Sequence, residues 1–433
     1  MSNSIEMKQT RTKSHVVPDR FGVAYVDLAS DIDFYNLSDR YTVPDLYGEI
    51  PASAFGSNDI AFVEENGHPE LVPCYQVESA ATNYVKQSSL IVFDDDPWSG
   101  ERVSVTSGDS SPDGGGSGFY IKPTAVSGSH VVMQANTTGP SADGTYITSC
   151  FVKYDSAKPN NSYFCFEINS YPFSGSGSTG IVQYNVRDGY SAIMQSSNVV
   201  RHGMIKISEG FYWCWFSTTR SSDTGVIIVL QILNESKAKI FVGDGSGLIF
   251  WNPQFTEGTL PSSVIKTEAT VYTRDLDELV LPELSVPAAL FSGNYLLEVA
   301  FPFNSNLIDG TTWSRCIIGY GESGENSLNY CPDTKKFVIR KGSVTKVESG
   351  VVSFDRMKRI ILNVNCSAGT LAIEGAKTGN GIFTGTPWTW SSTFITFGHD
   401  ISDTDYLNGY VSSIFKKLYD PESSTITRTW HNY

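Results

Sequence analysis

The sequence lacks the features that mark several large classes of protein. No stretch of its 433 residues approaches the ~20 consecutive apolar residues of a transmembrane helix. The opening segment, MSNSIEMKQTRTKSH, is polar and has no apolar core of the kind found in a signal peptide. Charged residues are only 18% of the chain, and 31 Lys and Arg face 46 Asp and Glu, which gives a net charge of −15. This shortage of basic residues argues against binding to nucleic acid and against electrostatic docking on an anionic membrane.

Cysteine is also scarce, and its pattern excludes a disulfide scaffold. The chain has 7 cysteines, none in a CxxC pair, and the closest neighbours are Cys150 with Cys165 and Cys316 with Cys331. An odd count at low density is unlike the disulfide framework of small secreted proteins. We therefore expect most of the cysteines to be buried free thiols that pack as small hydrophobic groups. This usage is typical of a protein that assembles in a reducing cytoplasm.

The motifs of familiar enzyme classes are missing. The sequence contains no HExxH, no phosphate-binding loop, no GxSxG and no dinucleotide fingerprint. The 6 histidines are scattered, and His399-Asp400 is expected to be an ordinary loop pair. We predict that the chain is not an enzyme. A glycosidase that uses two carboxylates from distant positions stays open, because such a pair leaves no local motif.

What the sequence does contain is a long series of short β-type segments. Aromatic residues are 12% and glycines number 38, a composition that favours an all-β protein. Apolar and polar residues alternate in many of the segments, and turn residues recur every ten residues or so. No amphipathic helical pattern interrupts them. The first series covers 144–154, 161–169, 180–186, 211–219, 226–233 and 247–255; the second covers 295–303, 314–321, 335–342, 359–365, 370–375, 392–398 and 410–419.

This spacing predicts two consecutive β-sandwich domains that follow an N-terminal segment. The first sandwich is placed at 78–275 and the second at 288–433. The acidic segment 276–287 (LDELVLPELSVP) holds two prolines and is taken as the linker. Within 21–77, we expect a hairpin with strands at 60–63 and 70–72, because Asn66-Gly67 is a strong signal for a tight hairpin turn.

The polar arm at 1–20 has two interpretations. It is either a frayed terminus or a segment that becomes ordered against a partner. In the second case its basic residues are the candidate contacts: Lys8, Arg11, Lys13 and Arg20.

Two features of the first sandwich give local expectations. Asn83 follows a β-type run, where its side chain can bind neighbouring backbone and hold the strand end. In FYWCWF (211–216) apolar residues occupy both faces, so we expect a central strand that is covered on both sides.

Four segments together resemble tailed-bacteriophage virion proteins of the tail-fibre or receptor-binding type. GHPELVPCYQVESAATNYV (67–85) is similar to the turn, short strand and Glu-x-Ala-Ala-Thr-Asn that open a jelly roll related to carbohydrate-binding modules. SEGFYWCWFS (208–217) resembles the Gly-Trp-Tyr-Arg strand, with Phe in place of Trp and Trp in place of Arg. GDGSGLIFWNPQFTEGTLPSSVIKT (243–267) resembles the closing strand, and YLNGYVSSIFKKLYDP (406–421) resembles the last strand of a concanavalin A/laminin-G-like jelly roll.

The matching positions are few and specific, and so are the departures. Asn252 stands where the family pattern has Gly, and the acidic residue comes late, at Glu257. The positions that agree are Glu78, Ala80, Ala81, Thr82, Asn83, Gly210, Gln254, Gly258, Pro261, Ser263, Ile265 and Thr267.

The resemblance implies a non-enzymatic virion protein. The residues before the first sandwich would attach it to other virion proteins, and the C-terminal domain would face a host surface glycan or protein receptor. The resemblance further implies a homotrimer, made in the bacterial cytoplasm and carried on the virion, at the tail or its fibres rather than the capsid. Two alternatives stay open: a structural decoration protein of the capsid or tail, and a glycan depolymerase or esterase.

Candidate binding residues come from loop-like contexts. Aromatic rings stack on the apolar faces of sugars, so tryptophans near turns are candidates for glycan contact, with core packing as the alternative for each. A second candidate is a Ca²⁺ site, because spaced carboxylates before Asn408-Gly409 supply the oxygen ligands that Ca²⁺ prefers. No other cofactor is expected. The glycan candidates are Trp98, Trp313, Trp388 and Trp390, and the Ca²⁺ candidates are Asp400, Asp403 and Asp405.

Overall fold

The structure is a computed structural model of the whole chain. It describes residues 79–390 with gaps, and seven further strands at 24–26, 33–35, 60–65, 68–73, 75–77, 395–397 and 409–416. The gaps within 79–390 are 89–96, 109–110, 113–117, 137–142, 157–160, 172–177, 196–197, 207–209, 221–224, 275–277, 282–293, 302, 307, 309–314, 321–325, 356–357, 359. Among the described residues, no helix is long and apolar enough to cross a membrane.

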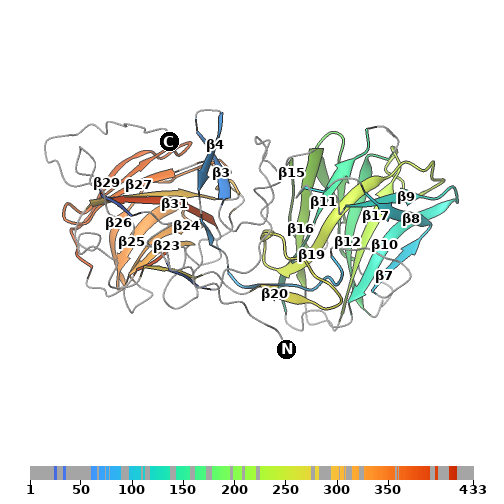
Figure 1. Cartoon of the computed structure of the whole chain (residues 1–433), viewed down its shortest axis with the longest axis horizontal. Coiled ribbons are helices and arrows are strands. Elements are labelled where there is room, and N and C mark those ends of the chain that lie inside the picture. The colour runs from blue at the N-terminus through green and yellow to red at the C-terminus, as the bar shows by residue number, and fades with distance from the viewer. Residues whose placement is uncertain are drawn as a thin grey trace. The chain divides into compact units, whose positions relative to one another are not determined.

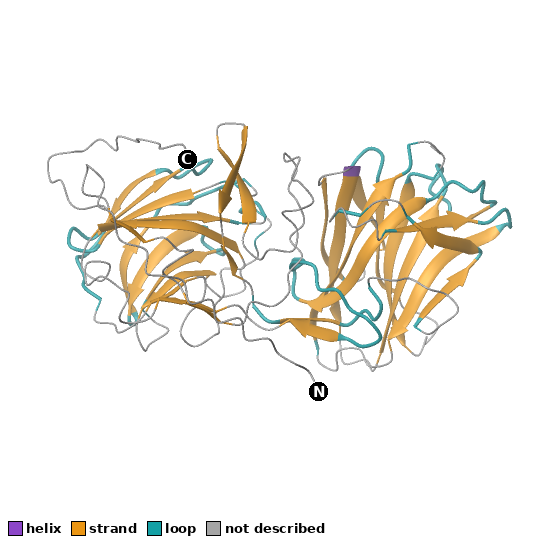
Figure 2. Cartoon of the chain, in the orientation of Figure 1, coloured by secondary structure: helices purple, strands orange, loops and turns teal. Residues whose placement is uncertain are grey.

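The fold is all-β and divides into two compact units (Figures 1 and 2). The central unit comprises Asn36–Pro73 and Glu78–Asp277, and the terminal unit comprises Met1–Tyr35, Cys74–Val77 and Glu278–Tyr433. Each unit contains two large antiparallel sheets. The fold class predicted from the sequence is therefore confirmed.

The central unit has two sheets of long strands. The first runs in the order β14 (Tyr190–Gln195), β13 (Ser178–Asn185), β12 (Tyr163–Tyr171), β17 (Gly225–Leu233), β10 (Gly128–Asn136) and β18 (Ile240–Phe241), and β7 (Trp98–Glu101) also pairs with β10. The second runs in the order β15 (Val199–Lys206), β16 (Phe211–Arg220), β11 (Gly144–Tyr154), β19 (Leu248–Glu257), β9 (Phe119–Pro123) and β8 (Val103–Ser107). A small sheet joins β6 (Ala81–Asn83) to β20 (Tyr272–Arg274).

The core of the central unit lies between its two sheets. Phe164 and Phe166 of β12 meet Phe250 and Phe216 of the opposite sheet, with ring centroids 5.3 and 6.2 Å apart. Burying one such aromatic side chain stabilises the fold by about 2–3 kcal/mol. Strand β16 lies between β15 and β11, and Phe211, Trp213, Cys214, Trp215 and Phe216 are all buried. The prediction of a central strand covered on both faces is confirmed.

Most of the described cysteine side chains are also buried. Among the described cysteines, Cys150, Cys165, Cys214, Cys316 and Cys366 are buried and free, and Cys331 is half-buried and free. Burial raises the pKa of the Cys150 and Cys214 thiols well above the ordinary value, because an apolar environment disfavours the thiolate. The prediction of buried free thiols holds for the first five of these residues.

The terminal unit also contains two sheets. One has the order β1 (Ala24–Val26), β31 (Gly409–Lys416), β22 (Asn294–Ala300), β27 (Ile360–Asn365), β28 (Thr370–Glu374), β29 (Gly381–Thr384). The other has the order β2 (Asp33–Tyr35), β21 (Glu278–Leu281), β30 (Ile395–Phe397), β23 (Arg315–Tyr320), β24 (Ser327–Cys331), β25 (Lys336–Lys341), β26 (Val344–Glu348). The hydroxyls of Tyr295 on β22 and Tyr320 on β23 are hydrogen-bonded to each other across the two layers.

The segment before the first sandwich contributes strands to the terminal unit. Strand β1 pairs with one end of β31, and β5 (Tyr75–Val77) pairs with the other end. Strand β22 also pairs with β31 along most of its length. Because a strand has only two edges, β1 and β5 share the edge that β22 leaves open. Long-range strand pairing of this kind leaves no local sequence signal, and the segment was not expected to contribute to the second sandwich.

The hairpin predicted from Asn66-Gly67 is confirmed. Strand β3 (Ile60–Glu65) pairs in antiparallel register with β4 (His68–Pro73), and Glu65 faces His68 across the two-residue turn. Both strands are longer than expected, because the pairing continues up to the turn itself.

The predicted linker at 276–287 contains a strand. Strand β21 pairs with β30 on one side and with β2 on the other. The sequence of this strand, ELVL, is apolar enough to enter a sheet, and the prolines that suggested a linker follow it. The linker prediction is therefore wrong for Glu278–Leu281.

Candidate functional site

The tryptophans proposed from the sequence are core residues wherever the structure describes them. Trp98, Trp388 and Trp390 are only 2%, 5% and 5% exposed. The Trp390 ring stacks on Tyr320 with centroids 4.0 Å apart and planes at 7°, and Trp98 Nε1 donates to the Gln87 carbonyl at 3.2 Å. Of the two interpretations given for these rings, core packing is the one that holds for the three described tryptophans. Trp313 lies outside the described residues.

The remaining predicted site residues fall outside the described part of the chain. These are the Ca²⁺ candidates Asp400, Asp403 and Asp405, and the attachment candidates Lys8, Arg11, Lys13 and Arg20. Within the described part, no group of three or more His, Cys, Asp and Glu side chains is arranged to hold a metal ion.

The motif residues of the first sandwich form a buried hydrogen-bond network that connects the opening and closing segments of the domain. The Asn83 side chain accepts hydrogen bonds from the backbone N–H groups of Val85, at 3.1 Å, and Phe255, at 3.0 Å. Its Nδ2 donates to the Ile265 carbonyl at 2.8 Å. Asn83 thus ties the opening segment to the closing strand β19 and to the tail that follows, and it is fully buried. The sequence predicted a local turn-holding role, which the Val85 contact confirms; the two distant contacts were not predicted.

Other motif positions extend the same network. The Gln254 side chain accepts the N–H of Ile265 at 2.6 Å. The Thr267 hydroxyl donates to the Val85 carbonyl at 2.6 Å and accepts the N–H of Ser88 at 3.0 Å. These buried side chains satisfy backbone groups of the opening segment and of the irregular tail. Their role is structural.

The backbone conformation at Asn252 explains why Asn can stand where the virion-protein pattern has Gly. Its φ is +46°, in the left-handed region that Gly adopts most readily and Asn tolerates. The register of β19 against β11 shifts at this point, since Ser149 faces Gln254 but Phe151 faces Trp251. Asn252 therefore occupies a β-bulge, and its Oδ1 accepts the Ser88 hydroxyl at 3.1 Å.

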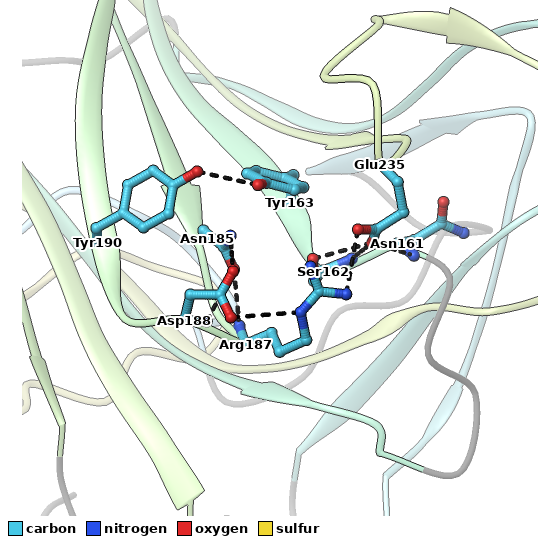
Figure 3. A network of polar contacts seen from close by, with 8 residues as sticks. All are labelled: Asn161, Ser162, Tyr163, Asn185, Arg187, Asp188, Tyr190 and Glu235. Atoms are coloured by element: carbon cyan, nitrogen blue, oxygen red, sulfur yellow. Dashed lines mark hydrogen bonds and ion pairs between the residues drawn. The ribbon is translucent and has the colours of Figure 1, made fainter.

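A second polar cluster lies at the surface of the central unit, and it is the candidate binding site (Figure 3). We call it the Tyr190 site and define it as Asn161, Ser162, Tyr163, Asn185, Arg187, Asp188, Tyr190, Glu235 and Lys237. Three segments build it: the start of β12, the turn from β13 to β14, and the turn that follows β17.

Glu235 anchors one side of this site. Its Oε1 accepts hydrogen bonds from the N–H of Asn161 at 3.1 Å, and from the N–H and hydroxyl of Ser162 at 2.8 and 2.9 Å. Its Oε2 lies 3.2 Å from the Arg187 guanidinium. The proximity of Glu235 raises the pKa of Arg187. One carboxylate thus fixes the start of β12 to the β13–β14 turn, as the dashed lines in Figure 3 show.

Asn185 shapes the turn between β13 and β14. Its Oδ1 accepts the N–H groups of Arg187, at 3.0 Å, and Asp188, at 2.9 Å. Its Nδ2 donates to Asp188 Oδ2 at 2.7 Å, and Gly189 has a φ of +72° that completes the tight turn. Arg187 Nε also lies 3.4 Å from Asp188 Oδ1. The charged side chains of the site are therefore held by a rigid backbone.

Two tyrosines form the aromatic side of the site. Their hydroxyls are 2.9 Å apart and their ring centroids are 6.3 Å apart, with planes at 72°. Tyr163 is 7% exposed, whereas Tyr190 is 40% exposed. The hydrogen bond with Tyr190 raises the pKa of Tyr163, and the hydrogen bond from Tyr163 lowers the pKa of Tyr190.

This arrangement suits binding of a polyhydroxylated ligand. An exposed aromatic ring can cover the apolar face of a sugar, while neighbouring charged and amide groups exchange hydrogen bonds with its hydroxyls. Because the polar groups are fixed by the turn and by Glu235, little conformational entropy is lost when a ligand binds.

Sequence reasoning did not single out any residue of the Tyr190 site. The segment NVRDGY (185–190) carries a Asp188-Gly189 turn signal between two alternating runs, and this signal could have located the hairpin. Nothing in the local pattern could have added Tyr163 or Glu235, which lie 27 residues before Tyr190 and 73 residues after Ser162.

Comparison with known proteins gives little further guidance. Neither a protein-family model nor a curated protein matches the chain. One similar solved structure is the N-terminal CBM22-1-CBM22-2 tandem domain of Xyn10C from Paenibacillus barcinonensis, with 10% sequence identity. The match covers 79% of this chain and 99% of the other, with a TM-score of 0.26. A TM-score this low does not establish a shared fold.

Proposed function

We propose that this chain is a non-enzymatic virion protein of a tailed bacteriophage, a tail fibre or receptor-binding adhesin that binds a host surface glycan. The four segments that resemble such virion proteins support the viral assignment. The network around Asn83 also supports the viral assignment, since motif positions that are far apart in the sequence are joined by hydrogen bonds in the fold.

The Tyr190 site carries the proposal of glycan binding. The Tyr190 ring is 40% exposed, and Arg187, Asp188 and Lys237 beside it are exposed and charged. A ring of this kind supplies the stacking surface, and the charged groups supply donors and acceptors for sugar hydroxyls. A single shallow site of this type binds weakly, so useful affinity would come from several copies acting together. A homotrimer, attached through its N-terminal segment to other virion proteins, would provide them.

The binding test uses an array of bacterial capsular polysaccharides, lipopolysaccharides and teichoic acids, probed with the full chain. The informative variant is Tyr190→Ala, and the matched control is Tyr272→Ala, another tyrosine of the central unit, 49% exposed. Loss of the stacked ring should weaken binding about tenfold or more, while the control should bind as the wild type does. Absence of binding to every polysaccharide, or equal loss in both variants, would overturn the proposal.

A second experiment places the protein on the particle. Gold-labelled antibody against the full chain is applied to intact phage particles and viewed by electron microscopy. Label at the tail or its fibres is the expected result. Label over the capsid would instead favour a decoration protein, and particles without label would remove the viral assignment. Release of soluble oligosaccharide from a bound polysaccharide would show that the chain is a depolymerase.

A further inference from the structure

Lys237 is set in the Tyr190 site by a tight turn. Lys237 N–H donates to the Asn234 carbonyl at 2.8 Å, and the N–H of Ala238 donates to Asn234 Oδ1 at 2.8 Å. The φ of Lys237 is +63°, a conformation that the turn imposes on it. The ammonium group lies 5.5 Å from the Tyr163 ring centroid and 5.9 Å from the Tyr190 ring centroid. Its position over both rings is that of a cation–π contact.

The other cations of this region are already paired. Arg187 contacts both Glu235 and Asp188, and Lys239 lies 3.2 Å from Glu167. Lys237 has no carboxylate within ion-pair distance among the described residues. It is also exposed. Its charge is therefore free to meet an anion from solution.

The Tyr190 hydroxyl is a second, neutral group close to Lys237. The Tyr163 and Tyr190 hydroxyls lie 2.9 Å apart, and Tyr163 is nearly buried. The Tyr190 hydroxyl is the one of the two that a ligand in solvent can reach, since Tyr190 is 40% exposed. The Lys237 ammonium, which also contacts the Tyr190 hydroxyl, and that hydroxyl thus place two donors, one of them charged, beside an exposed ring.

From this arrangement we infer that the Tyr190 site recognises a sugar that carries a carboxylate, with Lys237 and the Tyr190 hydroxyl as donors to the acid group and the Tyr190 ring against the sugar face. The inference rests on the proposed glycan-binding function and narrows it to acidic saccharides. Of the nearby carboxylates, Asp188 and Glu235 are both paired with Arg187, so neither takes the ammonium group of Lys237.

The experiment compares each acidic polysaccharide with its own neutral form. Uronic-acid-containing capsular polysaccharides are carboxyl-reduced, which converts each acid to a primary alcohol and leaves the linkages intact. The wild-type chain should bind the native form about tenfold more tightly than the reduced form, the usual worth of one exposed charge-assisted hydrogen bond. Raising the salt concentration should reduce this preference.

Variants separate the acid contact from the stacking contact. Lys237→Gln should abolish the preference for the native form while leaving binding to the reduced form unchanged. The control Lys206→Gln changes another exposed lysine of the central unit and should keep the full preference. Tyr190→Phe keeps the ring and should lower the preference without loss of binding to the reduced form.

Each outcome decides between the two claims. Equal binding of native and reduced polysaccharides, still abolished by Tyr190→Ala, would overturn the acidic-sugar inference and leave the glycan-binding function standing. A preference for phosphate-bearing teichoic acids that contain no carboxylate would also overturn it. Binding to neither form of any polysaccharide would overturn the inference together with the proposed function.

Discussion

Asn83 accepts the backbone N–H of Phe255 at 3.0 Å, although the two residues are 172 positions apart in the sequence. The same side chain donates to the Ile265 carbonyl, and it is completely buried. The opening and closing segments of the central unit are thus joined by one carboxamide group.

We expect Asn83→Ala to destabilise the central unit strongly. The change leaves the N–H groups of Val85 and Phe255 and the Ile265 carbonyl buried without their partner. The expected loss is about 3–5 kcal/mol in the free energy of unfolding. Urea unfolding of the full chain, followed by tryptophan fluorescence, measures it. Asn198→Ala, at an exposed position, is the control, and equal midpoints for the two variants would contradict the prediction.

At the Asn252 bulge, we expect a Gly variant to be more stable than an Ala variant. Asn252→Gly relaxes the φ of +46° and removes a buried Nδ2 that has no partner, but it loses the bond from the Ser88 hydroxyl. These effects offset each other, so its stability should stay within about 1 kcal/mol of the wild type. Asn252→Ala loses the same bond without relief at the backbone and should cost about 1–2 kcal/mol. A urea midpoint for the Ala variant at or above that of the Gly variant would refute this account.

The buried thiols should resist labelling until the protein unfolds. A variant with Cys74→Ser and Cys331→Ser retains the five cysteines that are buried in the structure. A thiol reagent needs access and thiolate, and burial denies access and raises the pKa of Cys150 and Cys214. Ellman's reagent should therefore find no fast-reacting thiol in the native variant and all five in guanidinium. Rapid reaction of any of these five cysteines in the native state would show that its thiol is accessible and would contradict the prediction.

His202 should make the central unit less stable in mild acid. Burial lowers the pKa of His202 below its ordinary 6.5, and its Nδ1 lies 2.9 Å from the Ser191 hydroxyl. The unfolded chain therefore binds a proton at a pH where the folded chain does not. The free energy of unfolding should be fully retained above about pH 6.5 and should fall as the pH drops through the folded pKa.

Urea midpoints at pH 7.5 and pH 5 check this for the wild type and for His202→Gln. The variant should lose less stability between the two values than the wild type does, because it has no imidazole to protonate. An identical pH dependence in both proteins would mean that His202 titrates alike in the folded and unfolded states.

Local pattern was sufficient for some features of the fold. Alternation predicted several strands of each unit, and Asn66-Gly67 predicted the hairpin of β3 and β4. The apolar run at 211–216 predicted a strand covered on both faces, which β16 is. Each of these depends on neighbours within a few residues, where side-chain periodicity and turn conformation act directly.

The same kind of pattern failed where burial depends on distant segments. Trp388 and Trp390 lie between Gly, Pro and Ser in a loop-like sequence, yet Trp390 packs flat on Tyr320 of β23. The acidic, proline-containing segment after the first sandwich was taken as a linker, yet Glu278–Leu281 finds two strand partners. Whether a short apolar stretch is exposed is decided by what covers it, and the local sequence does not contain that information.

By itself, the sequence determined the all-β class, the division into two sandwiches and the free buried thiols, because these follow from composition and short-range periodicity. Only the tertiary structure decided that Asn83 joins segments far apart, that β1, β2 and β5 complete the sheets of the terminal unit, and that Tyr163, Tyr190 and Lys237 meet at one surface. The physical reason is that strand order within a sheet is set by the packing of whole faces against one another, and it is this order that brings side chains from distant turns to the same end of the sandwich.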